Sequence, residues 1–324
     1  MPFFAPRNLY CMFLGVVLAG CEAQLDLSGV DAQRSQATHR SDLFQAVARH
    51  QDTVITVGGM GALVQSTDSG GNWTRTTLPG KPFLIDITVC PDGGFHAIEK
   101  TDGLWSIQAD GSWVRKTLPE MTEPQAMTCD SNNVIWVTGG FSTIIHSDDA
   151  GASWENWTID EDLYLTTIQF VDESHGIVTG EFGTVLLTTD GGINWDRADD
   201  LPDSFYPQST YFSSPETGWA VGLNGTIWAT ENGAQSWQQA PSGIESPLYG
   251  IRGFGDTLVA VGENTTILYR SPDHSTWHLL DGAVKSRTYL RGIISMGDNE
   301  FIAAGGGGAL FTITVPQNEA GDSG

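Results

Sequence analysis

Three aspartates of the 324-residue chain share one local pattern, and carboxylates that recur in this way are candidates for catalysts or calcium ligands. The pattern is Ser/Thr-x-Asp-x-Gly-x-x-Trp. It pairs Asp68 with Trp73, Asp149 with Trp154 and Asp190 with Trp195, and a fourth copy carries Asn232 before Trp237. A calcium loop needs oxygen-bearing side chains at alternate positions, where this pattern places glycine. We therefore interpret these residues as structural, each carboxylate accepting hydrogen bonds from backbone N–H groups of its own turn.

The pattern resembles the Asp box of sialidase-type (BNR) repeats. Sialidases combine an arginine cluster with a Tyr–Glu nucleophile pair and an acidic Asp, but their Arg-Ile-Pro signature is absent from this chain. The seven histidines show no metal-ligand spacing, and neither a Gly-x-Ser-x-Gly elbow nor a phosphate loop occurs. We expect no catalytic residue, metal or cofactor. Because 39 Asp and Glu residues can form a facing pair by chance, a sialidase-like glycan-processing or glycan-binding protein is the alternative.

The amino terminus carries a targeting signal. One arginine and a short apolar run lead to Leu-Ala-Gly before Cys21, and the run is too short to span a bilayer permanently. This order resembles the lipobox of bacterial lipoproteins, so we expect a diacylglycerol group on the Cys21 thiol. The protein is then expected on the periplasmic side of the envelope, anchored by lipid to the inner or outer membrane. An ordinary secretory signal is the alternative.

A repeated tryptophan predicts the elements that position these residues. Six tryptophans recur at intervals of 40 to 42 residues, a period typical of β-propellers: Trp73, Trp113, Trp154, Trp195, Trp237 and Trp277. Apolar runs that end at glycine, such as 53–58 and 176–180, precede the boxes and indicate buried strands. One weaker strand comes before each run and two follow it. Four strands per repeat are the blade of a propeller.

The repeats predict an all-β fold, a seven-bladed β-propeller of four-stranded blades closed by pairing of N- and C-terminal strands. Six complete repeats run from about Asp42 to Gly282, and a seventh repeat, 287–315, lacks its last strand. The segment Ala23–Asp31 could supply that strand; six blades with a decorating hairpin is the alternative. The expected parts are a lipoprotein signal peptide at 1–20, a lipidated segment at 21–41, the propeller at 42–315 and a disordered tail at 316–324.

Two cysteines of the propeller lie about one repeat apart. Cys90 and Cys129 each end a first strand of a blade, which places them at equivalent positions of neighbouring blades. An oxidising compartment would permit a disulfide between them. Equivalent strands of neighbouring blades are often too far apart for such a bond, so a disulfide and two free buried thiols both stay open.

The charge of the chain limits its partners. The formal net charge is −24, and such a field repels phosphate backbones, so we expect no nucleic-acid partner. The best cationic cluster is Arg252, Arg287 and Arg291, which lie at or near the first strands of the last two blades. First strands line the central channel of a propeller, so this cluster is a candidate for partner binding. Pairing of the arginines with surface carboxylates is the alternative.

The chain resembles the photosystem II stability/assembly factor family of cyanobacteria and plastids, which has relatives in non-photosynthetic bacteria. The resemblance covers about Asp42 to Val315 and rests on Val-x-Val-Gly strands before the boxes, as in Val57-Gly58 before Asp68. It implies a non-enzymatic chaperone that binds a membrane protein through an arginine-rich patch. We therefore expect a membrane-tethered scaffold that binds an envelope or membrane protein and assists its assembly.

Overall fold

Short strands rich in Val, Ile and Leu, separated by tight glycine turns, build the described part of the chain. The computed structural model describes residues 36–120, 123–159, 161–271, 276–280, 282 and 287–316. Apart from Gln36, these residues belong to one unit that begins at Ala37. The expected signal peptide, Cys21, the candidate strand Ala23–Asp31 and the tail beyond Pro316 lie outside the described residues.

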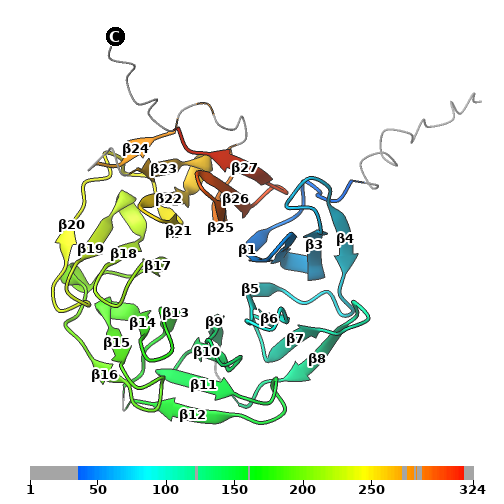
Figure 1. The fold of residues 1–324 in the computed structure, drawn as a ribbon, viewed down its shortest axis with the longest axis horizontal. Helices are drawn as coiled ribbons and strands as arrows, with labels where there is room; N and C mark the ends of the chain where they lie inside the picture. The colour runs from blue at the N-terminus through cyan, green and yellow to red at the C-terminus, as the bar shows by residue number, and fades with distance from the viewer. Residues whose placement is uncertain are drawn as a thin grey trace, which may run out of the picture. The chain divides into compact units, whose positions relative to one another are not determined.

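Seven antiparallel sheets surround a central channel (Figure 1), which confirms the predicted seven-bladed propeller and shows that the six-bladed alternative is wrong. Each sheet is a meander of consecutive strands. Blade 1 consists of β1 (Phe44–His50), β2 (Thr53–Gly58), β3 (Ala62–Ser66) and β4 (Thr74–Thr77). Blade 2 consists of β5 (Leu84–Val89), β6 (Phe95–Glu99), β7 (Gly103–Ile107) and β8 (Trp113–Thr117). Blade 3 consists of β9 (Pro124–Cys129), β10 (Ile135–Gly139), β11 (Thr143–Ser147) and β12 (Glu155–Thr158).

The remaining blades follow the same order. Blade 4 consists of β13 (Leu165–Phe170), β14 (Gly176–Gly180), β15 (Val185–Thr188) and β16 (Asp196–Arg197). Blade 5 consists of β17 (Ser209–Phe212), β18 (Gly218–Val221), β19 (Ile227–Thr230) and β20 (Gln238–Gln239). Blade 6 consists of β21 (Leu248–Phe254), β22 (Thr257–Gly262), β23 (Ile267–Arg270) and β24 (His278–Leu279). Blade 7 consists of β25 (Leu290–Gly297), β26 (Glu300–Gly305) and β27 (Leu310–Thr314). Single 3-10 turns occur at η1 (Gly59–Gly61), η2 (Glu181–Gly183), η3 (Pro202–Ser204), η4 (Leu223–Gly225) and η5 (Glu263–Thr265).

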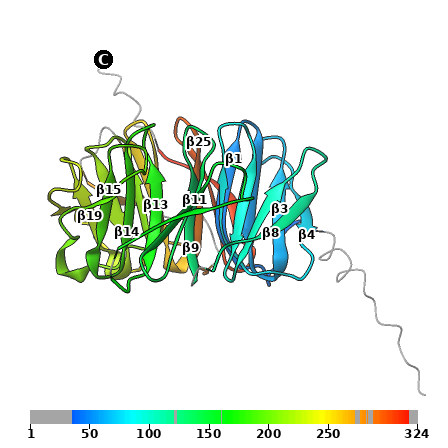
Figure 2. The ribbon, with the colours of Figure 1, turned by 90° about the horizontal axis from the view of Figure 1, so that it is seen from below.

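The innermost strands of the blades run parallel to one another. Ile251 N donates to Ser209 Oγ at 3.3 Å, and the Thr167 and Thr210 hydroxyls lie 2.9 Å apart. Residues about 42 positions apart therefore stand at the same height in the channel. All second-to-third turns consequently lie on one face of the ring, and all Asp-box turns lie on the other face, with the strands running between them (Figure 2). We call these the tip face and the box face.

Box tryptophans seal the contacts between neighbouring blades. Trp195 of blade 4 is buried and meets Trp136 of blade 3 edge-on, with ring centroids 6.0 Å apart. Trp237 is likewise buried in a cluster with Ile177 and Val185 of the preceding blade. Large aromatic rings bury much apolar surface, so each hairpin acts as a wedge between sheets.

The two ends of the propeller meet between blades 7 and 1. An isolated antiparallel bridge joins Leu43 to Gly306, and Gly308 N donates to Asp42 O at 3.1 Å. Phe44 and Ile302 pack in one buried cluster across this boundary. Blade 1 takes all four strands from consecutive sequence, and blade 7 has three strands within the described residues. Whether Ala23–Asp31 supplies a further strand stays a prediction.

Candidate binding channel

The Asp-box side chains hold their own turns. Asp68 Oδ1 accepts from Asn72 N at 2.7 Å and from Ser66 Oγ at 2.7 Å, while Oδ2 accepts from the Asn72 amide at 2.7 Å. These hydrogen bonds, above all the one from the Asn72 side chain, lower the pKa of Asp68 to about 2. Asp149 and Asp190 accept equivalent bonds, which lower their pKa values as well. All three carboxylates therefore lie on the box face and accept hydrogen bonds from their own turns.

Asn232 preserves the same turn without a charge. Its amide oxygen accepts from Ser236 N at 3.0 Å and from the Thr230 hydroxyl at 3.0 Å. Its amide nitrogen donates to Ser236 Oγ at 2.9 Å. Since the neutral amide accepts the same turn hydrogen bonds as the carboxylates, the geometry of the box does not require an ionised group.

The structure joins Cys90 to Cys129 in a disulfide. Their Cα atoms lie 5.0 Å apart, within the range that a disulfide spans. Cys90 directly follows β5, and Cys129 ends β9. The bond therefore ties the innermost strands of blades 2 and 3 together where both approach the box face.

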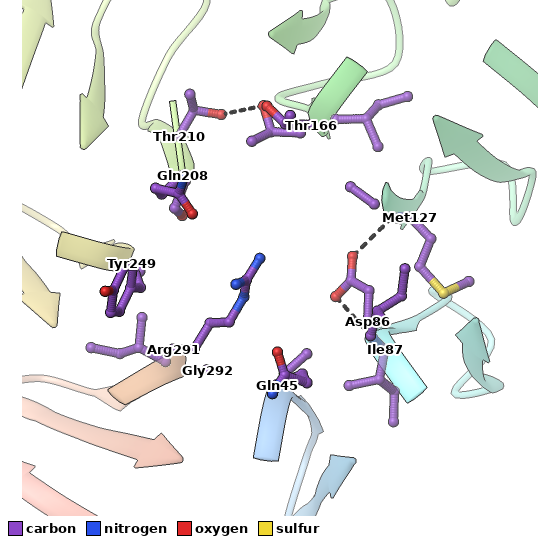
Figure 3. Close-up of a pocket in the computed structure, with 18 of the residues that line it drawn as sticks. Gln45, Asp86, Ile87, Met127, Thr166, Gln208, Thr210, Tyr249, Arg291 and Gly292 are labelled. Carbon is purple, nitrogen blue, oxygen red and sulfur yellow. Dashed lines mark hydrogen bonds between the residues drawn. The ribbon is translucent and has the colours of Figure 1, made fainter. Parts of the chain in front are cut away.

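The innermost strands enclose a polar cavity of about 180 Å³ on the channel axis. Every blade contributes to its wall, as Figure 3 shows for residues from Gln45 to Gly292. Polar side chains tie adjacent strands around it. The Thr166 hydroxyl donates to Pro207 O at 3.1 Å, and the Gln169 amide donates to Phe212 O at 2.8 Å. The wall therefore offers amides and hydroxyls to a ligand, along with a few charges.

Asp86 is the one carboxylate on this wall among the described residues. Its Oδ1 accepts from Ile87 N and its Oδ2 accepts from Met127 N, each at 2.8 Å. Burial nevertheless raises its pKa to about 6, although these hydrogen bonds and the charges of Arg252 and Arg291 oppose the rise. The side chain is therefore partly protonated near neutral pH.

Arg252 and Arg291 line the same cavity, whereas Arg287 does not. Asp86 and Arg291 project into it from the strands on either side of the strand that carries Gln45 (Figure 3). Within the described part of the chain, neither Arg252 nor Arg291 has a carboxylate within ion-pair distance. Burial lowers the pKa of Arg252, opposed by the charges of Asp86 and Tyr211. The predicted arginine cluster is thus brought together only in part, as two guanidinium groups in a polar channel.

Asp86 was not predicted as a site residue, although the first strands carry a signal for it. Asp86 pairs with Ile98 of the second strand of its blade. In the other blades, the first-strand position that is equivalent to Asp86 holds a small residue. These residues are Ala46, Ala126, Thr167, Ser209, Gly250 and Gly292. An ionisable residue in this ring of small side chains is conspicuous once the strands are aligned by their bulges.

Other kinds of site are not evident in the residues that the structure describes. These residues hold no group of three or more His, Cys, Asp or Glu side chains placed to bind a metal ion. The channel wall offers Asp86 without a facing second carboxylate, which two-carboxylate glycoside hydrolysis requires. A glycan-binding site would need exposed tryptophan rings, and the three candidates for such rings are buried (Trp105) or half-buried (Trp157 and Trp228). None of the described helices has the length and apolar character needed to cross a membrane.

Solved structures with the same fold include both binding proteins and enzymes. YCF48 from Cyanidioschyzon merolae superposes with a TM-score of 0.71 at 15% identity, covering 85% of this chain and 96% of that chain. YCF48 bound to D1 peptide gives a TM-score of 0.71 at 12% identity, with 86% and 93% covered. Virginiamycin B lyase from Staphylococcus aureus gives 0.67 at 16% identity, with 88% and 97% covered. At these identities the likeness shows the fold alone.

Sequence comparison gives the family. No curated protein matches the chain. The family model described as photosynthesis system II assembly factor YCF48 matches residues 152–320, which is more than half of the chain. This match confirms the resemblance predicted from the Asp boxes and Val-x-Val-Gly strands. The chain therefore belongs to the photosynthesis system II assembly factor YCF48 family.

Proposed function

We propose that this chain is a non-enzymatic scaffold that binds a segment of a membrane or envelope protein. The observation that carries the proposal is the pair Arg252 and Arg291, two guanidinium groups without ion-pair partners in the described structure, facing a polar channel. Guanidinium groups bind carboxylates through paired hydrogen bonds. The channel is thus suited to hold an acidic group of a partner. Asp86, the one carboxylate on the wall among the described residues, does not make the pair of carboxylates that glycoside hydrolysis requires.

Relatives give the proposal further support. A structure with this fold is YCF48 bound to D1 peptide, so the scaffold is able to hold a peptide. The acidic surface of the present chain, at a net charge of −24, favours partners that carry positive charge elsewhere. We place the protein on the periplasmic side of the envelope, anchored through lipid on Cys21, which brings it close to membrane proteins.

The test compares full-length proteins purified from membranes after chemical cross-linking. We expect one defined envelope protein to be cross-linked to the wild type. The Arg252→Gln/Arg291→Gln variant should give at least about 90% less of this cross-linked product, since each bidentate contact of an arginine with a carboxylate raises the affinity several-fold. Arg287→Gln is the matched control, because this exposed arginine lies outside the cavity. Cys21→Ala should release the protein from membranes and abolish the cross-link.

Two results would count against the proposal. An unchanged cross-linking pattern in the double arginine variant would remove the channel from the binding site. Equal recovery with Cys21→Ala would show that lipid does not bring the two proteins together. Turnover of aryl-glycosides that depends on Asp86 would instead establish an enzyme on this fold.

A further inference from the structure

Three apolar side chains stand exposed at equivalent tips of the propeller. They occupy the middle of the second-to-third turn in blades 1, 3 and 4, and they are Met60, Phe141 and Phe182, with exposed fractions of 64%, 54% and 63%. Their φ angles are 58°, 51° and 57°, so all three lie in the left-handed region. Because the innermost strands are parallel, the three tips project from the same side of the ring, the tip face.

This conformation is unfavourable for a bulky residue, because its Cβ crowds the following carbonyl oxygen. Glycine and asparagine adopt it at lower cost. Blades 5, 6 and 7 follow that rule at the equivalent positions, with Asn224, Asn264 and Gly307. In blades 1, 3 and 4 the side chain is exposed, so burial within the folded chain does not offset the cost. A role outside the propeller accounts for keeping apolar residues at these three tips.

Most other exposed apolar side chains lie on the same face. Of the eleven large apolar residues exposed in the described structure, seven precede a first strand or lie in a second-to-third turn, whereas two lie on the box face. The seven are Leu43, Met60, Phe83, Phe141, Phe182, Tyr206 and Leu223, and the two are Ile193 and Phe254. Scattered exposure is normal for soluble proteins, but concentration on one face marks an interaction surface.

The apolar surface is continuous over blade 1. A Cβ added to Gly59 would lie 3.2 Å from the Phe83 ring and 3.7 Å from Leu43 Cβ, so these two side chains flank the turn that carries Met60. Phe83 also forms one wall of an open groove of about 1050 Å³ between blades 1 and 2. The prolines Pro79 and Pro82 extend this wall. An extended chain segment would find apolar contacts from the tip of blade 1 into the groove.

The floor of this groove is charged because blade 2 departs from the other blades. Glu99 stands where the pairing with the first strand places glycine in blades 1, 3, 4, 6 and 7. Its buried carboxylate accepts from Arg115 Nε at 2.8 Å, and Arg115 Nη2 donates to Asp102 Oδ1 at 2.6 Å. With Glu123 and Lys100 on the lining, three carboxylates face two cations. The groove therefore carries an excess of negative charge.

We propose that the tip face docks an extended, apolar and cationic segment of a partner protein, which seats its apolar side chains on Met60, Phe141 and Phe182 and a Lys or Arg in the groove. The proposal rests on the proposed function, that the chain binds a protein, and assigns the face and the chemistry. Charge complementarity selects this occupant. A second copy of this chain and an anionic membrane both carry the negative charge that the groove repels.

The experiment replaces the three tips by the residue that blades 5 and 6 use, giving Met60→Asn/Phe141→Asn/Phe182→Asn. Ile193→Asn on the box face is the matched control, since Ile193 is 76% exposed. The probe is a fluorescent 14-residue peptide of alternating Leu and Lys, with Leu/Glu and Ser/Lys peptides of equal length as comparisons, titrated by anisotropy in 150 mM salt. The triple variant and Ile193→Asn keep the net charge, so non-specific attraction of the peptide is the same in both.

We expect the Leu/Lys peptide to bind the wild type, and the triple variant to bind it at least tenfold more weakly. The triple variant should unfold at the same temperature as the wild type or a higher one, because asparagine adopts the left-handed conformation of the tips with less backbone strain. Ile193→Asn should bind like the wild type. Replacing Asp102 by Asn should weaken binding of the Leu/Lys peptide. It should not change the thermal midpoint of unfolding, since Asp102 is exposed.

Several outcomes would overturn this assignment. Equal binding of the Leu/Glu peptide, or none of the Leu/Lys peptide, would contradict the cationic partner. Loss of binding in Ile193→Asn would move the docking surface to the box face. Dimers in sedimentation velocity that the triple variant loses would show that the tips bind a second copy of the chain. Vesicle binding that the triple variant loses would show that they bind a membrane. The triple variant is also compared with Arg252→Gln/Arg291→Gln in the cross-linking test. If the triple variant still cross-links the envelope protein and the arginine variant does not, the assignment of docking to the tip face is wrong and the proposed function stands.

Discussion

Asp86 combines two backbone hydrogen bonds, which favour its charged form, with burial, which favours its neutral form, and burial prevails. The Asp-box carboxylates are the opposite case, because solvent and turn hydrogen bonds both favour the charged form. The same residue type therefore titrates in separate ranges on the channel wall and on the box face.

We predict that the Asp86→Asn variant loses a pH dependence that the wild type shows. The folded pKa of about 6 lies above the ordinary value of 3.8, so the folded state binds more protons between these values and stability falls as the pH rises through them. The shift corresponds to up to about 3 kcal/mol above pH 6. Urea unfolding between pH 4 and 7 measures the slope.

The matched control for this prediction is Asp68→Asn. The folded pKa of Asp68 is lowered to about 2, so its stabilising contribution is present above the ordinary value of 3.8 and is lost as the pH falls toward 2. Asp68→Asn should therefore leave the slope between pH 5 and 7 unchanged, where Asp86 still titrates. The assignment to Asp86 fails if Asp86→Asn keeps the wild-type slope in that range.

Single residues also mark the limit of what the sequence predicted. The Asp-box turns were predictable, because Asp68 and its hydrogen-bond partners Ser66 and Asn72 lie within a few positions of one another. Asp86 and Arg252 lie 166 positions apart in the sequence and line the same cavity only because the ring closes. Arg287 and Arg291 are neighbours in sequence, yet only Arg291 is inside a first strand and reaches the channel. Local patterns were thus predictable from the sequence, whereas the set of side chains that shares the channel was not.

At the scale of the blade, the packing of blade 4 against blade 3 leaves room only for glycine in the box of blade 4. Gly192 in the box of blade 4 has a φ of 88°, and a Cβ there would collide with the indole of Trp136 in blade 3. Neighbouring blades approach so closely at this point that the hairpin has no room for a side chain. The spacing of the tryptophans predicted the repeats because each wedge is a local hairpin, and the apolar strands of 287–315 predicted the seventh blade. This contact between blades was not predictable from one repeat.

We predict that Gly192→Ala destabilises the propeller more than Gly80→Ala does. Both glycines have positive φ, and the space around Gly80 is open. Gly80→Ala should therefore show only the left-handed backbone cost of about 1 kcal/mol. Gly192→Ala should add about 1–3 kcal/mol of overpacking against Trp136. Denaturant midpoints measure both, and equal losses would show that the blades relax freely around the added methyl group.

At the scale of the whole molecule, charge repulsion opposes the folded state. The formal net charge of −24 is carried by 39 acidic and 15 basic residues. Ions at about 0.1 M screen exposed charges beyond about 10 Å. The compact ring holds its carboxylates closer together than the unfolded chain does, so screening should favour folding.

We therefore predict that the thermal midpoint at pH 7.5 rises by about 3 °C between 10 and 500 mM sodium chloride, which corresponds to about 1 kcal/mol for a large domain. The internal control is the same titration at pH 4.3, near the isoelectric point of the sequence, where the rise should vanish. A rise of equal size at both pH values would assign the effect to preferential exclusion of salt and not to charge screening.

The floor of the tip-face groove constrains how blade 2 is able to change. A Cβ on Gly103 would collide with the Glu99 carboxylate, and the equivalent positions of the other blades hold alanine or threonine, at Ala62, Thr143, Thr184, Thr226, Thr266 and Ala309. A glutamate that keeps its contact with Arg115 is thus compatible with glycine at position 103 and with no larger residue. A substitution that adds a side chain at position 103 would therefore require the Glu99 carboxylate to leave its place beside Arg115.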